Sequence, residues 1–270
     1  MKAIKLKNLL PLFLIAIFIF SACDNNTQEN GSNDIAEAEN ELDNDAESSE
    51  SQTIAGLELA ADSQSSYIVL PPPEDDGNMS VERALANRRS QRNFQNQALS
   101  LEQVSQILWA AYGITLPRPD DPRGGLRTTP SAGALFPLEV YVIVGNVDGI
   151  KPGVYRYIPT DHKIEQVVDG DIRSELSDAA LGQRMVEAAP ISVFYTAVFE
   201  RTTEIYGDDR GIIYVYMEVG HSAQNVYLQA EAMGLGTCAI GAFIDGRIQQ
   251  ILNLTDDEEP LYLMPVGYYY

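Results

Sequence analysis

Residues 127–141 read Arg-Thr-Thr-Pro-Ser-Ala-Gly-Ala-Leu-Phe-Pro-Leu-Glu-Val-Tyr, and this stretch decides the fold. Its first half is a loop of small residues in which Pro130 and Pro137 fix the backbone φ angle at both ends. Gly133 can adopt backbone conformations that other residues avoid. Because residues 131–134 carry so little side chain, the backbone of this loop can contact a flat ligand. A tight turn that simply precedes a core strand is the alternative interpretation.

The second half of the stretch is a strand that is apolar on both faces. Val140, Val142 and Val144 alternate with Tyr141 and Ile143. Such a strand is typical of the middle of a sheet that has helices on either side. Helices are predicted before and after a central group of strands joined by hairpins. This order favours an α+β fold, with a mixed or mainly antiparallel central sheet flanked by helices, over a doubly wound one.

Caps, periodicity and turn residues place the other elements. Ser80 can cap a helix that ends near residue 89 and buries Val81 and Leu85. A capping box at residues 100–103 opens a second helix, which stops at Gly113. Residues 116–129 are expected to form a loop. Further helices are expected over residues 172–180, 211–233 and 245–252, the last one capped by Asp245, and strands over residues 138–144, 153–158, 163–168, 191–199, 236–242 and 261–266.

The first 66 residues are predicted to lie outside the folded domain, which spans residues 67–270. Residues 1–22 have the basic start, apolar run and small-residue end of a signal peptide. The end of this segment resembles a bacterial lipobox, which implies a lipid on Cys23 and anchoring to a bacterial membrane. Secretion as a soluble or periplasmic protein is the alternative. Residues 24–66 hold twelve acids and no Lys or Arg, which predicts a disordered tether.

Composition narrows the kinds of ligand. Much of the formal charge of −21 comes from the acids of residues 24–66, but the folded part remains acidic. This argues against nucleic acid as a partner, because binding nucleic acid relies on a basic face that neutralises phosphates. Cys238 lies in an apolar run and is expected to be a buried residue. His162 and His221 are far apart and lack metal-ligand spacing, so no metal site is predicted.

Residues 88–92 read Arg-Arg-Ser-Gln-Arg and concentrate cations in an acidic chain. Guanidinium groups bind phosphate bidentately, and a Ser hydroxyl adds a further hydrogen bond. The segment therefore predicts a phosphate-binding site. A solvated basic patch is the alternative, since the dipole of a helix favours cations at its C-terminal end.

Glycines interrupt residues 230–241, which join the longest predicted helix to a buried strand. Gly234 is explained as the helix stop. Gly236 and Gly241 are better explained by a ligand or another backbone that approaches closely. The order of helix, glycines and strand is the reverse of the dinucleotide-binding fingerprint, which excludes that motif.

Four motifs follow one another along the chain: Arg-Arg-Ser-Gln-Arg-Asn-Phe (88–94), Thr-Pro-Ser-Ala-Gly-Ala-Leu-Phe-Pro-Leu-Glu-Val-Tyr (129–141), Glu-Val-Gly-His-Ser-Ala-Gln-Asn-Val-Tyr-Leu-Gln-Ala (218–230) and Gly-Leu-Gly-Thr-Cys (234–238). Together they resemble the nitroreductase family, and within it the SagB-type dehydrogenase (thiazoline/oxazoline oxidase-like) branch. The resemblance extends from about residue 80 to residue 270. It implies an α+β fold that binds FMN as an intertwined homodimer, with the flavin at the subunit interface.

The resemblance also implies roles for individual residues. Those expected to bind the cofactor are Arg88, Arg89, Ser90 and Arg92 around the phosphate, Pro130, Ser131, Ala132 and Gly133 of a second subunit along the flavin ring, and Gln224, Gly236, Ile240 and Gly241 near the ring. Relatives that oxidise azolines often carry Lys-Tyr before a Gly where this chain has Ile205-Tyr206-Gly207. Tyr206 is therefore the candidate catalytic residue, as a proton donor.

The leading hypothesis is an exported FMN-dependent oxidoreductase that transfers hydride through the flavin to or from a small conjugated substrate. NAD(P)H, a quinol or a small diffusible reductant would be the electron donor. One alternative is an azoline-to-azole oxidase that acts on a modified peptide and needs a cyclodehydratase partner. The other alternative is a non-catalytic, tethered flavin-binding lipoprotein.

Overall fold

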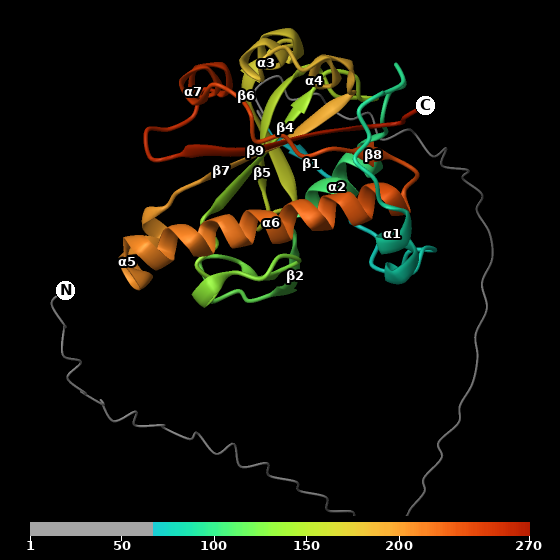
Figure 1. Ribbon diagram of the computed structural model, residues 1–270. Helices are drawn as coiled ribbons and strands as arrows, with labels where there is room; N and C mark the ends of the chain where they lie inside the picture. Colours follow the sequence, from blue (N-terminus) through green and yellow to red (C-terminus); the bar gives the residue numbers. More distant parts are fainter. Residues whose placement is uncertain (1–66) are drawn as a thin grey trace, which may run out of the picture. The chain divides into compact units, whose positions relative to one another are not determined.

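A computed structural model describes residues 67–270, so the predicted signal peptide, Cys23 and the acidic tether lie outside the described residues. The main sheet contains the strands Tyr67–Val69 (β1), Leu138–Val144 (β4), Gly153–Ile158 (β5), Lys163–Asp169 (β6), Ile191–Ala197 (β7), Gly236–Thr237 (β8) and Glu259–Gly267 (β9). Its order is β1-β6-β5-β4-β7-β9-β8, and all neighbouring strands are antiparallel (Figure 1).

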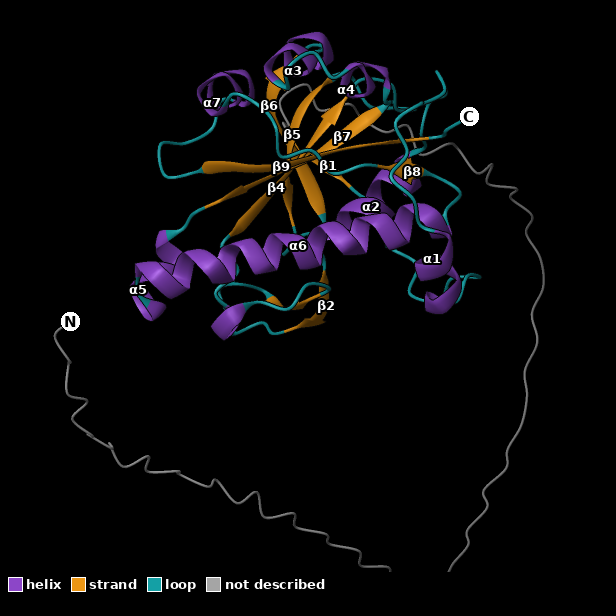
Figure 2. Cartoon of the chain, in the orientation of Figure 1, coloured by secondary structure: helices purple, strands orange, loops and turns teal. Residues whose placement is uncertain are grey.

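Helices cover both faces of this sheet (Figure 2). One face carries Leu101–Tyr112 (α2) and Asp208–Ala232 (α6), and the other carries Arg173–Ala179 (α3), Arg184–Ala188 (α4) and Asp245–Leu252 (α7). Two short helices, Val81–Asn87 (α1) and Glu200–Tyr206 (α5), contact opposite ends of α6. A hairpin of Ile114–Pro117 (β2) and Gly125–Arg127 (β3) lies outside the sheet. The predicted α+β fold with an antiparallel sheet is confirmed.

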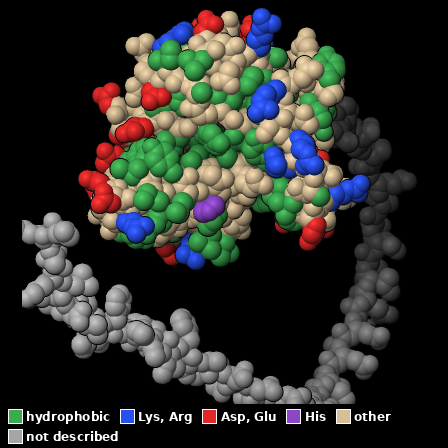
Figure 3. Space-filling model, in the orientation of Figure 1, with side chains coloured by type: hydrophobic (Ala, Val, Ile, Leu, Met, Phe, Trp, Pro, Cys, Tyr) green, Lys and Arg blue, Asp and Glu red, His purple; other side chains and the backbone are tan. Residues whose placement is uncertain are grey.

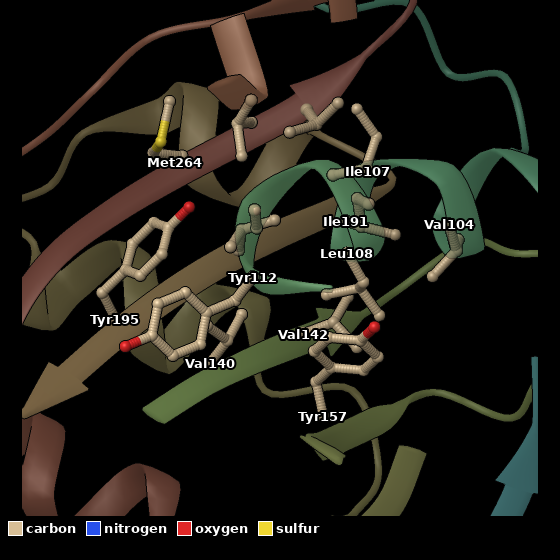
Figure 4. Packing of buried hydrophobic residues seen from close by; sticks show 14 of the residues in the cluster. Val104, Ile107, Leu108, Tyr112, Val140, Val142, Tyr157, Ile191, Tyr195 and Met264 are labelled. Carbon is tan, nitrogen blue, oxygen red and sulfur yellow. The ribbon is translucent and has the colours of Figure 1, made fainter. Parts of the chain in front are cut away.

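β4 lies in the middle of the sheet, as its sequence predicted. Val140, Val142 and Val144 belong to the core cluster beneath α2 and α6, part of which is shown in Figure 4. Tyr141 and Ile143 belong to the cluster beneath α3, α4 and α7. All five side chains are at most 4% exposed, and burying a side chain of this size stabilises the fold by about 1.5–3 kcal/mol. β4 is therefore a fixed anchor for the loop that precedes it.

Two predicted helix starts are also confirmed, but one predicted buried face is wrong. Ser80 caps α1 with its side chain, and Ser100 forms a reciprocal capping box with Gln103 at the start of α2. Val81 and Leu85 are 62% and 52% exposed, so this apolar face of α1 has no cover within the described chain.

Several predicted boundaries are wrong for local reasons. Residues 116–129 are not a simple loop, because β2 and β3 pair across their Pro- and Gly-rich turn. The strand expected over residues 236–242 shrinks to β8, since only a single bridge at Ile240 continues the pairing. Asp245 does not cap α7. It is the first residue of that helix, and the cap position is occupied by Ile244, whose apolar side chain makes no capping bond.

The helical segments were also incompletely predicted. α4 and α5 are too short, at five and seven residues, to show a clear apolar period. α6 begins at Asp208 and not at residue 211, because its first turn is acidic and its apolar pattern starts later. Gly207, with φ of +72°, separates it from α5. Within residues 67–270, no helix combines the length and apolar character needed to cross a bilayer.

Candidate functional site

The loop that enters β4 has an unusual backbone. Residues Ala132–Ala134 form a short 3-10 turn, and φ is positive at Gly133 (+60°), Ala134 (+51°) and Phe136 (+49°). A left-handed conformation costs a residue with a Cβ atom roughly 1–2 kcal/mol. Ala134 and Phe136 are therefore strained, and strain of this kind persists where the surroundings impose it, often at functional sites.

Glu218 of α6 anchors this loop from inside the protein. Its buried carboxylate accepts hydrogen bonds from the hydroxyl groups of Tyr112 and Ser131. Ser131 Oγ in turn accepts a hydrogen bond from Phe136 N at 2.9 Å, which closes the turn. Burial raises the pKa of Glu218, while the bonds from Ser131 and Tyr112 and the charge of Arg127 oppose this rise.

The same stripe of α6 continues with Ser222 and Asn225, at helical spacing from Glu218. Asn225 Nδ2 donates hydrogen bonds to Thr128 O and Thr129 Oγ1, both at 3.2 Å. Ser222 Oγ donates to Ala111 O at 2.6 Å, and Thr129 Oγ1 donates to the same carbonyl at 2.9 Å. α6 therefore fixes both the entry and the turn of the loop.

Two arginines hold the loop from outside. Arg123 Nη1 donates to Ala134 O at 2.8 Å, and Arg201 Nη1 donates to Phe136 O at 3.1 Å. Both carbonyls belong to the residues with strained backbones. The arginines thus stabilise a conformation that these residues would otherwise avoid.

Tyr206, the candidate catalytic residue, lies directly beside the middle of the loop. A Cβ atom on Gly133 would lie 2.8 Å from the Tyr206 hydroxyl oxygen. Glycine is therefore required here both by the positive φ and by this approach. The Tyr206 ring packs edge-on against Tyr214, with centroids 5.0 Å apart, and remains 39% exposed. The fold thus brings Tyr206 and Gly133 together from distant parts of the chain.

Tyr227 of α6 links the predicted phosphate-binding segment to residues 236–241. Its hydroxyl lies 3.0 Å from Ser90 Oγ and accepts a hydrogen bond from Ala239 N at 2.8 Å. The Arg88 guanidinium lies over the Tyr227 ring, 5.2 Å from its centroid, in a cation–π contact. These two segments are therefore adjacent in space, as their joint assignment to one site requires.

The arginines of residues 88–92 form no ion pair with a carboxylate of the described chain. Arg89 Nη1 donates to three carbonyls at the C-terminal end of α1, so helix capping occupies it. Arg92 makes one long bond, of 3.5 Å, to Ser90 O. Arg88 and Arg92 thus remain able to bind an anion. Figure 3 shows basic side chains gathered toward α1, while acidic side chains on this face gather toward α5.

The glycines of residues 236–241 differ in their surroundings. A Cβ atom on Gly236 would lie 2.6 Å from Gln91 Cβ, so packing within the chain already accounts for that glycine. A Cβ atom on Gly241 would meet only Tyr262 at 3.7 Å, which leaves space beside it. Ile240 is 4% exposed, so its backbone is more accessible to a ligand than its side chain.

The loop and the arginine segment contact α6 at different points. The loop bonds α6 at Glu218 and the arginine segment contacts α6 at Tyr227, nine residues or roughly 13 Å further along the helix. Gln224 is exposed and its side chain makes no hydrogen bond to the described residues, whereas the side chain of its neighbour Asn225 bonds the loop. The role predicted for Gln224 beside a flavin stays a prediction.

Other reactive side chains have structural roles. Cys238 is buried and free, as predicted, and burial raises the pKa of its thiol. His162 bonds Ser105 and Tyr157, which ties the turn between β5 and β6 to α2. Within residues 67–270, no group of three side chains is arranged to hold a metal ion.

A groove of about 660 Å³ lies between residues 72–84, α2 and the C-terminal half of α6. Its lining includes Trp109, Asn225 and Leu228, but none of the residues predicted to bind the cofactor. The groove therefore adjoins the loop through Asn225 without being the predicted cofactor site.

The fold and the site together define an α+β scaffold, in which one long helix supports an arginine segment and a strained loop of small residues. The chain belongs to the nitroreductase family, whose profile matches residues 85–268.

Relatives of the chain agree with this assignment. A Methanocaldococcus jannaschii protein named as a nitroreductase, MJ1384, is 48% identical over 200 residues, which cover 74% of this chain and 95% of that protein. A crystal structure of a nitroreductase-type protein from Ralstonia eutropha has a TM-score of 0.64 and 31% identity, and covers 76% of this chain and 90% of that one. The microcin B17-processing protein McbC of Escherichia coli is 27% identical, over 58% of this chain and 57% of McbC.

The sequence did not reveal Glu218, Asn225 or Tyr227 as supports of the site. All three lie in the motif of residues 218–230, in which only Gln224 was assigned a role. A signal was present, because Glu218, Ser222 and Asn225 place polar groups on one helical stripe that faces the core. Such a buried polar stripe needs partners, and the loop provides them.

Proposed function

We propose that the protein is an FMN-dependent oxidoreductase that transfers hydride through the flavin to or from a small conjugated substrate. Membership of the nitroreductase family supports oxidoreductase activity. The observation that carries the proposal is the pair Arg88 and Arg92, which flank Ser90 and have no carboxylate partner within residues 67–270. Such a pair fits the dianionic phosphate of FMN.

The residues present suit the phosphate and one side of the ring of this cofactor. Arg88, Ser90 and Arg92 would hold its phosphate, and the open side of Gly241 would admit the ring. The Thr237 hydroxyl is buried without a partner next to the arginine segment, which is consistent with a polar group that awaits a ligand nearby. When bound, FMN would supply the two-electron chemistry.

Tyr206 is assigned the transfer of a proton to the substrate. Its hydroxyl approaches Gly133, and the backbone of residues 131–133 would lie along the ring. A partly exposed phenol at this place can donate a proton and be reprotonated from solvent. Glu218 and Asn225 would keep the loop in the conformation that this arrangement needs.

The proposed site is completed by a second copy of the chain. α6 exposes an apolar face that includes Tyr216 and Met217, at 55% and 54%. Val81 and Leu85 of α1 are exposed as well. Burial of these side chains in a homodimer would bring the loop of one copy to the arginine segment of the other.

A second candidate function is oxidation of azoline rings in a modified peptide. It is favoured by the similarity to McbC, a microcin B17-processing protein, and it would require a separate enzyme that forms the azoline ring. Ile205 stands where azoline-oxidising relatives often carry Lys, which weighs against this candidate. Turnover of a synthetic thiazoline peptide by the FMN-loaded protein would favour it over the leading proposal.

We also propose that a lipid on Cys23 anchors the protein to a bacterial membrane. The electron donor would be NAD(P)H, a quinol or a small diffusible reductant. Mass spectrometry of protein extracted from membranes tests the anchor, because an unmodified Cys23 would contradict it. Nucleic acid is not a proposed partner, because the folded part of the chain is acidic.

FMN titration tests the binding site. Wild-type protein is expected to bind one FMN per chain and to sediment as a dimer. Arg88→Ala combined with Arg92→Ala should abolish FMN retention while the circular dichroism spectrum stays unchanged. Arg83→Ala, on the exposed side of α1, is the control and should retain FMN. Full occupancy in the double variant, or a monomer that keeps stoichiometric FMN, would contradict the proposal.

A further inference from the structure

Three arginines converge on residues 129–136, and one of them lacks an anion. Arg123 pairs with Asp121 at 2.8 Å, and Arg201 pairs with Glu139 at 2.6 Å. The guanidinium of Arg127 forms no ion pair with any carboxylate of residues 67–270, and its buried Nε has no hydrogen-bond partner there.

Two aromatic rings fix the Arg127 side chain in place. The central guanidinium carbon lies 4.3 Å from the centroid of the Tyr112 ring and 4.4 Å from that of Phe136. Cation–π contacts stabilise the charge, but they do not satisfy the N–H donors, which lie in the guanidinium plane. The group is therefore held rigidly while its donors remain unused.

The neighbouring acids do not pair with the Arg127 guanidinium. Glu218 and Glu139 are near enough to favour the charged form of Arg127, but Glu218 is bonded to Tyr112 and Ser131, and Glu139 is paired with Arg201. The Arg127 side chain is largely withdrawn from water, and this burial lowers the pKa of its guanidinium. A buried guanidinium without an ion pair is stabilised strongly by a carboxylate, which accepts two parallel hydrogen bonds from arginine.

We propose that Arg127 binds a carboxylate of the substrate at the edge of the reaction site. The inference rests on the proposed function and narrows the substrate class to small conjugated acids. Arg127 enters the loop that carries Gly133, and Phe136, which holds its guanidinium, closes the same loop. Tyr206 lies beside Gly133. A carboxylate on Arg127 would therefore orient the conjugated part of the substrate toward Tyr206.

Matched substrates test this site in the FMN-loaded protein. The reductions of 4-nitrobenzoate and of its neutral counterpart 4-nitrobenzamide are compared by kcat/KM. Wild type should prefer the acid by roughly ten- to a hundredfold, as expected for hydrogen bonds between charged groups. Arg127→Met should remove this preference by slowing the acid alone, and Arg127→Lys should retain part of it. Arg247→Met, an exposed position on α7, is the control and should match wild type.

Direct binding of benzoate by isothermal titration gives a second measurement, supported by circular dichroism and FMN content for each variant. Equal kcat/KM for the two substrates in wild type, with no benzoate binding, would overturn the inference. It would also be overturned if Arg127→Met slowed both substrates equally, because Arg127 would then be a structural support. If neither compound is reduced, the proposed function fails, while loss of benzoate binding in Arg127→Met still supports the carboxylate site.

Discussion

Replacing Asn225 with Ala is expected to destabilise the protein through the loop and not through the core. The substitution removes two hydrogen bonds, to Thr128 O and Thr129 Oγ1. Each neutral bond contributes about 0.5–1.5 kcal/mol to stability. Alanine returns up to roughly 0.7 kcal/mol through its better helix propensity. The free energy of unfolding should therefore fall by about 0.5–2.5 kcal/mol.

The neighbouring substitution Gln224→Ala is the matched control. It lies on the same helix and gains similar helix propensity, but Gln224 is exposed and its side chain makes no hydrogen bond within the described chain. Its effect on the free energy of unfolding should stay within about 0.5 kcal/mol.

Thermal unfolding of the flavin-free protein is the assay, because bound ligand would itself raise Tm. For a domain of this size, about 1 kcal/mol corresponds to roughly 2–4 °C, so Asn225→Ala should lower Tm by about 1–10 °C. FMN titration is expected to give the complementary result, in which Gln224→Ala weakens FMN binding without changing Tm. Equal Tm values for the two variants would refute the reasoning that α6 holds the loop through Asn225.

Three further substitutions or reactions test the buried groups. Burial raises the pKa of Glu218, so ionisation of this group disfavours the folded state, and stability is lost as pH rises from 4.5 through the raised pKa. Glu218→Gln removes this titration, so the urea midpoint of the variant should improve relative to that of wild type as pH rises. Urea midpoints that change with pH in parallel for the two proteins would contradict this. Tyr227→Phe should weaken FMN binding roughly three- to tenfold, because Ser90 and Ala239 N lose their shared partner, and unchanged affinity by fluorescence titration would refute that linkage. Cys238 should react with a thiol reagent at pH 8 far more slowly in the folded protein than after unfolding, because it is buried and its pKa is raised; equal rates would exclude this burial.

Sequence reasoning recovered the elements whose own side chains determine them. The alternation in residues 138–144 predicted the exact position of β4, and the polar groups of Ser80 and Ser100 predicted two helix starts. These features depend on neighbours close in sequence. Hence no knowledge of the tertiary structure was needed.

The failures arose where distant contacts decide the structure. β8 ends after Thr237 because the pairing with β9 is interrupted there and resumes only at Ile240, although the intervening residues are as apolar as a strand. Val81 and Leu85 carry the pattern of a buried face, but the described chain offers nothing to cover them. A pattern of apolar residues predicts that a face will be buried, not which chain will bury it.

The supports of the candidate site could not be predicted for a similar reason. Residue types pointed to the arginine segment and to the small-residue loop, but the hydrogen bonds that fix them come from α6, far away in sequence. The unpaired state of Arg127 could not be predicted either, since it depends on the rings of Tyr112 and Phe136 and on acids that are engaged elsewhere.

The most direct test of the central claim is an anaerobic absorbance titration of the FMN-saturated protein. Stepwise addition of NADH, or of a quinol if NADH has no effect, is expected to bleach the flavin bands. A single addition of 4-nitrobenzoate should then restore them in proportion to the acceptor added. Bands that bleach and recover with matching electron counts would agree with an oxidoreductase that works through bound flavin. Failure of the purified protein to bind FMN, or bound flavin that no acceptor reoxidises, would contradict it.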